Sequence, residues 1–456
     1  MTVDQLVAGA TTRDSSAPTG RFPTLEQWLR WQEGLHPNPI DLGLERVAAV
    51  WRRLHVGPPP FAVITVGGTN GKGSCVAMAE AILVAAGYRV GAYTSPHLLH
   101  YNERVRVAGG PVGDDELCES FARIDAARGE TSLTYFEFGT LAALDIFYRA
   151  QLDVAILEVG MGGRLDAVNI LDPDVALVTT VDIDHSAWLG DNREAIGREK
   201  AGIFRGGRPA VYGDADPPRS LVEHARAIGA ELYLAGRDYH AEPDAAGWRW
   251  EGGTRTRYAL PYPRLRGAYQ RKNAAAVVMA LESLAARLPV GQQALRLGLM
   301  TADVPGRFHV LDGQGLRICD VAHNPQAARS LAGQLATLPR AGRAHAVVAM
   351  LADKDQTAVI EAMAGAVDHW HVAGLSVARG ATAAALAAAV RAVAGAAAVS
   401  EYAEVAAALA GASAMAAGGE RIVVFGSFYT VAEALSPERR AWWDTAQAAA
   451  PKQQAG

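Results

Sequence analysis

The fold is decided by the stretch Val63-Ile64-Thr65-Val66-Gly67-Gly68-Thr69-Asn70-Gly71-Lys72-Gly73-Ser74, in which an apolar run leads into a glycine-rich turn. The apolar run predicts a buried strand, and the residues after the turn predict a helix. Glycines let successive backbone N–H groups converge on an anion, and the helix adds its positive end. Lys72 can reach the outer phosphates, while Ser74 or Thr69 offers a hydroxyl near a metal ion. The stretch therefore predicts a phosphate-binding loop that takes ATP.

This loop departs from the commonest P-loop pattern in two places. Val66 stands where that pattern has its first glycine, and Gly73 separates Lys72 from the hydroxyl residue. Glycine turns between a strand and a helix also occur in parallel-sheet proteins that bind no nucleotide, and this alternative stays open here. The strand before the loop and the helix after it favour phosphate binding.

Composition restricts the classes of partner. The 456 residues are 50% hydrophobic, enough for two or three domains, and the net charge is −5. This charge argues against a broad surface for nucleic acid or membrane, but it allows a local pocket for anionic small molecules. Residues 1–20 lack the apolar stretch of a secretory signal, so we expect a disordered tail and a cytoplasmic protein. A monomer is the default expectation.

Two further sequence features bear on whether the protein spans a membrane and whether its cysteines form disulfides. Residues 381–399 are mostly alanine with Arg391 in the middle, which predicts an alanine-rich helix of a soluble protein and not a bilayer span. Cys75, Cys118 and Cys319 have no paired spacing, so neither a disulfide framework nor a zinc site of cysteines is expected. Cys75 is interpreted as a small buried residue in the helix after the loop.

The order of apolar segments predicts an α/β protein with two domains. Helical spacing occurs at residues 25–31 and 42–54, and solidly apolar strands are predicted at 61–66, 89–94, 154–159 and 175–181. A small β excursion at 239–263 precedes a long helix at 269–287. A second set of strands follows at Val310, 316–321, 346–351, 369–372 and 421–425. We expect a tail at 1–20, an ATP-binding domain at 21–304 with a parallel-rich sheet, a second α/β domain at 305–440, and a tail at 441–456.

Polar residues at the ends of three predicted strands are candidate metal ligands. They are Ser95, Glu158 and His185, and open parallel sheets place their chemistry at such strand ends. Magnesium prefers oxygen ligands, so Ser95 and Glu158 suit it directly, whereas a histidine ligand is less usual. Alternatives are that Glu158 caps a nearby helix and that His185 is a hydrogen-bonded core histidine.

Eight motifs in this order resemble the folylpolyglutamate synthase family, relatives of the Mur ligases, and the likeness extends over residues 22–435. The motifs occupy residues 68–74, 95–97, 133–137, 158–166, 184–185, 197–204, 305–308 and 320–325. The resemblance implies a Mur-ligase-like ATPase domain and a Rossmann-like C-terminal domain, with ATP in the cleft between them. It also implies the cofactors ATP and Mg²⁺, with two magnesium ions and with K⁺ left open as a further ion.

The resemblance assigns roles to individual residues. Lys72, Lys200, His185 and Arg307 would be catalytic, Ser95, Glu158 and His185 would bind metal, and Lys200 would be the family's carbamylated lysine. ATP would be bound by Thr69, Asn70, Gly71, Lys72, Gly73, Ser74, Asn273, Arg307 and Asp320. Pteroate would be bound by Thr134, Tyr135, Phe136, Glu137, Leu165, Asp166 and Ala167, and glutamate by His323, Asn324 and Ser427.

The implied reaction is ATP-dependent addition of L-glutamate to dihydropteroate and to tetrahydrofolate or folylpolyglutamates through an acyl phosphate, with domain closure hinged at Pro305-Gly306. Without modification, Lys200 would be a cation on a helix surface. A Mur peptidoglycan ligase is one rival interpretation, and a non-catalytic nucleotide-binding scaffold is another. Val168, Ala187 and Tyr429 depart from the family's usual residues and leave the substrate preference open.

Overall fold

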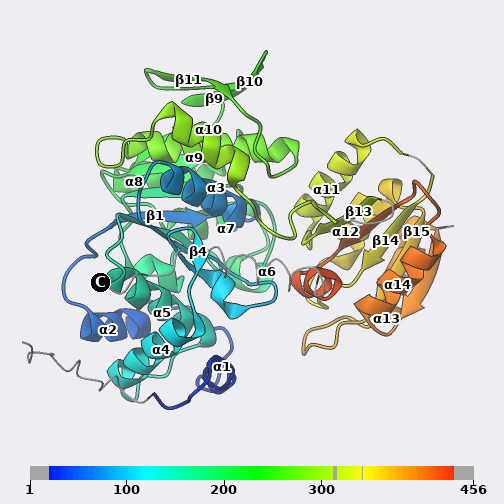
Figure 1. Cartoon of the computed structure of the whole chain (residues 1–456), viewed down its shortest axis with the longest axis horizontal. Coiled ribbons are helices and arrows are strands. Elements are labelled where there is room, and N and C mark those ends of the chain that lie inside the picture. Colours follow the sequence, from blue (N-terminus) through cyan, green and yellow to red (C-terminus); the bar gives the residue numbers. More distant parts are fainter. Residues whose placement is uncertain (1–19, 312–315, 341, 396, 436–456) are drawn as a thin grey trace, which may run out of the picture.

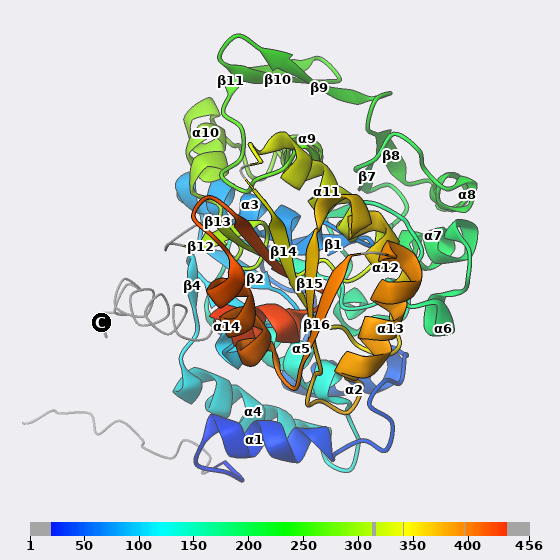
Figure 2. The ribbon, with the colours of Figure 1, turned by 90° about the vertical axis from the view of Figure 1, so that its right-hand side faces the viewer.

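The computed structural model describes residues 20–311, 316–340, 342–395 and 397–435. Two α/β domains lie side by side in Figure 1, the first coloured blue to green and the second yellow to red. Figure 2 turns the molecule so that the second domain stands in front of the first. The boundary predicted at 304/305 falls between a helix that ends at Thr301 and a strand that begins at His309. The predicted tails lie outside the described residues, apart from Gly20.

The first domain is built on an eight-stranded sheet whose carboxyl edge carries the phosphate loop. In spatial order its strands are β4 (Gly110–Pro111), β3 (Val105–Val107), β2 (Val90–Tyr93), β5 (Val154–Glu158), β1 (Ala62–Gly67), β6 (Val175–Val178), β7 (Pro209–Tyr212) and β8 (Glu231–Leu234). The strands from β2 to β8 are parallel, while β3 and β4 form an antiparallel edge. The predicted strands at 61–66, 89–94, 154–159 and 175–181 are confirmed.

Helices cover both faces of this sheet because alternate residues of its strands face opposite cores. Ile64 and Val66 of β1 pack with α3 (Lys72–Ala85), α9 (Ala268–Ser283) and α10 (Gln292–Thr301). Val63 belongs to the other core. The helices of that side are α1 (Leu25–Glu33), α2 (Glu45–Leu54), α4 (Asp114–Arg128), α5 (Tyr135–Arg149), α7 (Arg193–Ala201) and α8 (Arg219–Ile228). Shorter turns are η1 (Tyr101–Arg104), η2 (Ala167–Ile170) and α6 (Ser186–Leu189).

A capping box fixes the start of α5. The Thr134 hydroxyl accepts a hydrogen bond from the Glu137 N–H at 3.2 Å, and the Glu137 carboxylate accepts one from the Thr134 N–H at 2.7 Å. Two of the helix's unpaired N–H groups are satisfied in this way. Arg46 of α2 also donates to Glu137 at 2.9 Å, so the cap ties α2 to α5.

The predicted β excursion is a three-stranded antiparallel sheet of β9 (Tyr239–Asp244), β10 (Gly247–Gly252) and β11 (Arg255–Leu260). Trp248 and Trp250 of β10 are fully buried. The Trp250 Nε1–H donates to the Ala275 carbonyl of α9 at 3.1 Å, which attaches the small sheet to the helix behind the phosphate loop.

The second domain has a six-stranded sheet, parallel except at one edge. In spatial order its strands are β12 (His309–Leu311), β13 (Leu316–Asp320), β17 (Arg421–Phe425), β14 (Ala344–Val348), β15 (His369–Ala373) and β16 (Ala398–Tyr402), with β12 antiparallel. One face is covered by α11 (Pro325–Thr337), α12 (Gln356–Met363) with η3 (Ala364–Ala366), and α13 (Ala383–Ala394). The other face packs against α14 (Val405–Met415).

The alanine-rich helix predicted at 381–399 is wrong in its extent. α13 ends at Ala394, and β16 begins at Ala398. Gly395 has φ +55°, a conformation that ends a helix, and alanine's high helix propensity hid the short strand that follows. The helix predicted at 269–287 likewise ends earlier, at Ser283. Among the helices of the described residues, none combines the length and the apolar character that crossing a membrane requires.

Candidate functional site

The phosphate loop leaves β1 in a backbone conformation that only glycine adopts readily. Gly68 has φ +137° and Gly71 has φ +90°. A Cβ on Gly68 would overlap the Thr179 hydroxyl, and one on Gly71 would lie 2.9 Å from Asn273 Oδ1. Gly71 is also the N-cap of α3, so the first N–H groups of this helix remain for an anion. The geometry matches the predicted phosphate cradle.

Two lysines point at one carbonyl of this loop. Lys72 Nζ donates to the Gly68 carbonyl at 3.1 Å, and Lys200 Nζ of α7 donates to the same oxygen at 2.9 Å. Burial lowers the pKa of Lys72, although the charges of Glu158 and Asp184 oppose the shift. For Lys200, burial and then the charge of Lys72 lower the pKa to about 7. The loop thus brings two lysine amines together where phosphate oxygens would bind, and their burial disfavours the charged forms.

The expectation that an unmodified Lys200 is a helix-surface cation is wrong. The side chain is buried, with 4% exposure of the residue, because α7 packs its Lys200 face against the phosphate loop. A neutral amine is favoured at such a position, since desolvation penalises the charged form.

The three predicted metal ligands line one cavity of about 340 Å³ between the domains. Glu158 ends β5 and is 5% exposed, and its carboxylate accepts a hydrogen bond from the Ser95 N–H at 3.2 Å. Burial raises the pKa of Glu158, with Lys72 acting in the opposite direction. A buried carboxylate beside a hydroxyl and an imidazole in a lysine- and arginine-lined cavity fits a divalent cation that bridges phosphates.

His185 stands beside Asp184 at the start of α6, with φ +52°. Burial lowers the pKa of His185 to about 4 despite the adjacent carboxylate, so a ring lone pair is available to a metal ion. Burial alone would raise the pKa of Asp184, but His323, His185 and Lys354 together hold it well below its usual range. Lys354 Nζ lies 2.7 Å from Asp184 Oδ1.

A second cavity, of about 170 Å³, holds most of the other residues predicted to bind ATP. Asn70, Gly71, Ser74, Asn273, Arg307 and Asp320 all line it. Asn70, Gly71 and Arg307 also line the first cavity, so the two adjoin at the phosphate loop. The Asp320 carboxylate accepts hydrogen bonds from the Phe308 and Ala322 N–H groups at 2.8 Å each. Asp320 is therefore held within its own domain at the edge of this cavity.

The residues predicted to bind pteroate lie behind the wall of the first cavity. Thr134 and Glu137 form the cap of α5, and the Asp166 carboxylate accepts from the Met161 N–H at 2.8 Å and the Val168 N–H at 3.1 Å. Phe136 packs directly beneath Gly160, which lines the cavity. Among the described residues, the cavity is lined at this place by Val159, Gly160, Met161 and Gly162, whereas Tyr135, Leu165 and Ala167 do not line it.

Of the three residues predicted to bind glutamate, His323 and Ser427 line the first cavity. The Ser427 hydroxyl accepts from the Thr430 N–H at 3.0 Å. Asn324 instead connects the domains: its amide pairs reciprocally with the Asn70 amide at 3.1 Å and donates to Asp184 at 3.1 Å.

Sequence reasoning missed several polar and charged residues of the cleft. Lys354 follows β14 and reaches Asp184 across the domains, and Arg379 lines the same cavity. Gln326 accepts from the Asn70 amide at 2.5 Å. Arg104 lines the cavity opposite them and donates to His97 Nδ1 at 2.8 Å. Lys354 had a usable signal, since it stands just after a predicted strand, the position at which Ser95 and Glu158 were found.

The fold and these cavities define a two-domain α/β enzyme with a phosphate-binding loop in its interdomain cleft. Residues 66–280 match the family model of the Mur ligase middle domain, and residues 306–428 match that of the Mur ligase glutamate ligase domain. Dihydrofolate synthase/folylpolyglutamate synthase of Escherichia coli is 45% identical over 411 residues, which are 90% of this chain and 94% of that protein. The protein of the same name from Haemophilus influenzae is 40% identical and covers 90% of this chain and 96% of its own length.

Solved structures agree with these matches. E. coli FolC in complex with DHPP and ADP has a TM-score of 0.87 at 44% identity, covering 93% of this chain and 99% of that one. A bifunctional folylpolyglutamate synthase/dihydrofolate synthase with Mn, AMPPNP and L-glutamate bound has a TM-score of 0.84 at 45% identity, covering 93% and 99%. This chain belongs to the Mur ligase family, among the dihydrofolate synthase/folylpolyglutamate synthases, and it is a ligase.

Proposed function

We propose that this chain adds L-glutamate to dihydropteroate and to tetrahydrofolate or folylpolyglutamates, activating each carboxylate as an acyl phosphate at the expense of ATP. The observation that carries the proposal is the convergence of Lys72, Glu158 and Arg307 on one cavity, which adjoins the second cavity at the phosphate loop. This convergence, with the relatives' names, favours catalysis over a non-catalytic scaffold and folates over peptidoglycan precursors.

The proposed cofactor is Mg²⁺, with two ions held through Ser95, Glu158 and His185 and, on modification, Lys200; K⁺ is a further candidate ion. The related structure with Mn and AMPPNP supports a divalent ion with the nucleotide. Such an ion would neutralise phosphate oxygens and help to align them. The Ser95 N–H donates a hydrogen bond to the Glu158 carboxylate and so holds this group where it lines the cavity.

The first step we propose is attack by a substrate carboxylate oxygen on the γ-phosphorus of ATP, with ADP as the leaving group. Carboxylate and triphosphate repel each other, and Lys72 and Arg307 line the cavity where that repulsion would be offset. The α-amine of L-glutamate then attacks the acyl carbon, the amine loses a proton, and phosphate leaves from the tetrahedral intermediate. An amide bond results.

Lys200 is proposed to carry a carbamate formed by attack of its neutral amine on CO₂. Its lowered pKa and its position beside Lys72 support this, since the product would be an anion among cationic groups. Uptake of isotope-labelled bicarbonate at Lys200, followed by mass spectrometry, would test it.

Domain closure over the acyl phosphate is proposed to exclude water, with the hinge at Pro305-Gly306. The hydrogen bonds of Asn324 and Lys354 to the first domain are the contacts that closure would strengthen. The Val321 N–H donates to the Gly306 carbonyl at 2.9 Å, so rotation would begin just before Gly306. Solution scattering that shows no compaction with an ATP analogue and pteroate would remove the hinge proposal.

The remaining assignments follow from the resemblance. The wall formed by Gly160 over Phe136, with Asp166 holding the Met161 N–H, is proposed to shape the pteroate site, and His323 and Ser427 to face the incoming glutamate. We propose a cytoplasmic monomer, in keeping with three unpaired cysteines and small-molecule substrates.

The test is turnover by the purified protein. Phosphate release from ATP is expected to require both L-glutamate and either dihydropteroate or tetrahydrofolate, and the glutamylated product should accumulate in equal amount. ATP hydrolysis that is indifferent to the pteroate and to glutamate would contradict the proposal.

A further inference from the structure

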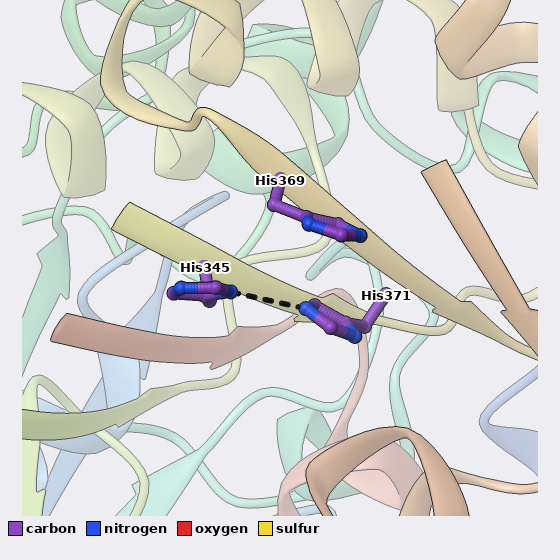
Figure 3. A group of neighbouring side chains, drawn as sticks. All are labelled: His345, His369 and His371. Carbon is purple, nitrogen blue, oxygen red and sulfur yellow. Dashed lines mark hydrogen bonds between the residues drawn. The ribbon is translucent and has the colours of Figure 1, made fainter. Parts of the chain in front are cut away.

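Three histidines lie together in the second domain (Figure 3). They are His345 of β14 and His369 and His371 of β15. His345 and His369 are direct neighbours in the parallel register, and His371 lies opposite Val347. His345 and His369 lie near the amino-terminal ends of their strands and His371 lies in the middle of β15, whereas the cleft is lined by residues after the carboxyl ends, such as Leu351. None of them has a role in the ligase reaction described above.

The cluster is buried. His345 is 1% exposed, His371 is 0% exposed, and His369 is half-buried. They lie on the same sheet face as Val347 and Ala373, which pack against α14. Buried imidazoles need polar partners, and three placed together at a domain core are costly unless the arrangement satisfies them.

Each imidazole has one ring nitrogen held by an oxygen from outside the cluster. His345 Nε2 lies 3.1 Å from Glu420 Oε2, His369 Nε2 lies 2.9 Å from Ser400 Oγ, and His371 Nδ1 lies 3.1 Å from the Tyr402 hydroxyl. The Glu420 carboxylate also accepts from the Arg343 and Ala417 N–H groups, so it stays ionised and fixes the proton of His345 on Nε2. A carboxylate behind a histidine is the arrangement that orients histidine ligands of metal ions.

The opposite nitrogens of His345 and His371 face each other. His345 Nδ1 and His371 Nε2 are 3.1 Å apart, the dashed line of Figure 3. Two imidazole ligands of a tetrahedral zinc ion, with Zn–N distances of about 2.0–2.1 Å, have nitrogens separated by about 3.3 Å. One potential ligand atom from each of the three histidines lies within 4.8 Å of the others.

We propose that His345, His369 and His371 form a binding site for a divalent transition metal ion of the zinc type, with water as the fourth ligand. Imidazole nitrogen is a ligand that Zn²⁺ favours, and a set of oxygen ligands would have suited Mg²⁺ instead. Burial lowers the pKa of His369, and burial together with the other two histidines lowers that of His371 to about 4, so both stay neutral and keep a lone pair.

Binding requires two rearrangements. With the His345 proton on Nε2, the hydrogen bond between His345 Nδ1 and His371 Nε2 places the His371 proton on Nε2, so this proton must move to Nδ1, which then donates to the Tyr402 hydroxyl. The rings of His369 and His371 are stacked, with centroids 4.3 Å apart and an interplanar angle of 15°, so their in-plane lone pairs do not yet converge. His369 is the half-buried member and has a single hydroxyl partner, and turning its ring would direct a nitrogen toward the other two. The bound ion would link β14 and β15 directly, and β16 and the turn before β17 through Tyr402 and Glu420.

The test uses the full chain without an affinity tag, stripped with a chelator and kept free of nucleotide. Zn²⁺ is titrated against a chromophoric chelator, and Co²⁺ is added in parallel to record its ligand-field absorption. The wild type is expected to bind one equivalent with nitrogen and oxygen ligands and to unfold at a higher temperature with Zn²⁺. His369→Gln should weaken this binding by about 100-fold or more and abolish the thermal shift.

Controls locate the ion. His240→Gln changes an exposed histidine of β9 and should leave the titration unchanged. His371→Gln is a second variant of the site and should also weaken binding. If this substitution of a fully buried residue prevents folding, the half-buried variant His369→Gln still decides the test. The proposal is overturned if the wild type binds no ion. It is equally overturned if His369→Gln retains wild-type affinity, because the ion would then lie elsewhere, for example at the histidines of the cleft.

Discussion

The carboxyl edges of the two sheets face the same cleft, but they contribute to it differently. In the first domain the functional groups hold one another: Lys72 and Lys200 share the Gly68 carbonyl, and the Ser95 backbone holds Glu158. In the second domain the groups reach outward, with Lys354 and Asn324 both bonded to Asp184. We therefore propose that the first edge is a preformed phosphate and metal site, whereas the second edge acts through its contact with the first. Substitutions at the first edge should therefore lower activity more than substitutions at the second edge.

The largest effect is expected for Glu158→Gln in the first edge. The amide keeps the shape of the side chain but loses the charge that would hold a divalent ion, so kcat should fall by about 1000-fold or more. Thermal stability should be unchanged or higher, because a buried charge is removed. The measurement is glutamylated product formed per unit time, beside a melting curve.

Glu223→Gln, at an exposed ion pair with Arg219, is the matched control and should retain full activity. Near-normal turnover by Glu158→Gln would show that the first edge is not the metal site.

Gly68→Ala should have the next largest effect. The new Cβ meets the Thr179 hydroxyl and backbone at a φ of +137°, so the loop must move, and affinity for ATP should fall by about 100-fold. Gly87→Ala also places a side chain at a positive φ, +89°, but with open space around the Cβ, so it separates the strain of a positive φ from the clash. It should cost only about 1 kcal/mol of stability and leave ATP affinity intact. Equal ATP affinities of the two variants would count against a preformed loop.

Lys354→Met probes the second edge and should have a smaller effect. Its ion pair with Asp184 is largely buried, with side-chain exposures of 11% and 10%, so loss of the lysine leaves a carboxylate poorly compensated. We expect kcat/KM to fall by about tenfold. Arg391→Met, which breaks an exposed ion pair with Glu401 in the same domain, should change nothing. If Lys354→Met lowered activity as much as Glu158→Gln does, the two edges would be equally important, which would contradict the comparison.

The smallest effect is the pH dependence of stability due to Lys200. Its pKa is about 7 when folded against an ordinary 10.5, so between these pH values the unfolded chain binds more protons and stability rises with pH. Lys200→Met should flatten this rise in denaturant unfolding measured across that range. An unchanged slope would show that the folded protein does not bury a neutral amine there.

The sequence predicted the first edge better than the second. Its chemistry lies in contiguous motifs, such as residues 68–74, and in polar residues that end long apolar strands. The buried surroundings of Lys200 could not be predicted, because they depend on α7 packing against a loop 132 residues away. The position of Lys354 after a predicted strand was a usable signal, but its ion pair with Asp184 of the other domain could not be predicted.

The fully buried strands β1 and β5 were predicted, whereas β7 and β16 were missed. β16 is half-exposed and follows an alanine-rich helix, so neither its hydrophobicity nor the local propensity marked it. The capping box of Thr134 and Glu137 has a clear local signature, yet these residues were first interpreted through the resemblance alone. Local rules would have assigned them to the start of α5.

The central claim is that the substrate carboxylate is phosphorylated in this cleft. The most direct measurement uses dihydropteroate labelled with a heavy oxygen isotope in its carboxylate, with ATP and L-glutamate, and analyses the phosphate released. The account predicts that one labelled oxygen passes to phosphate for each amide formed. Phosphate that carries no label while product accumulates would contradict it.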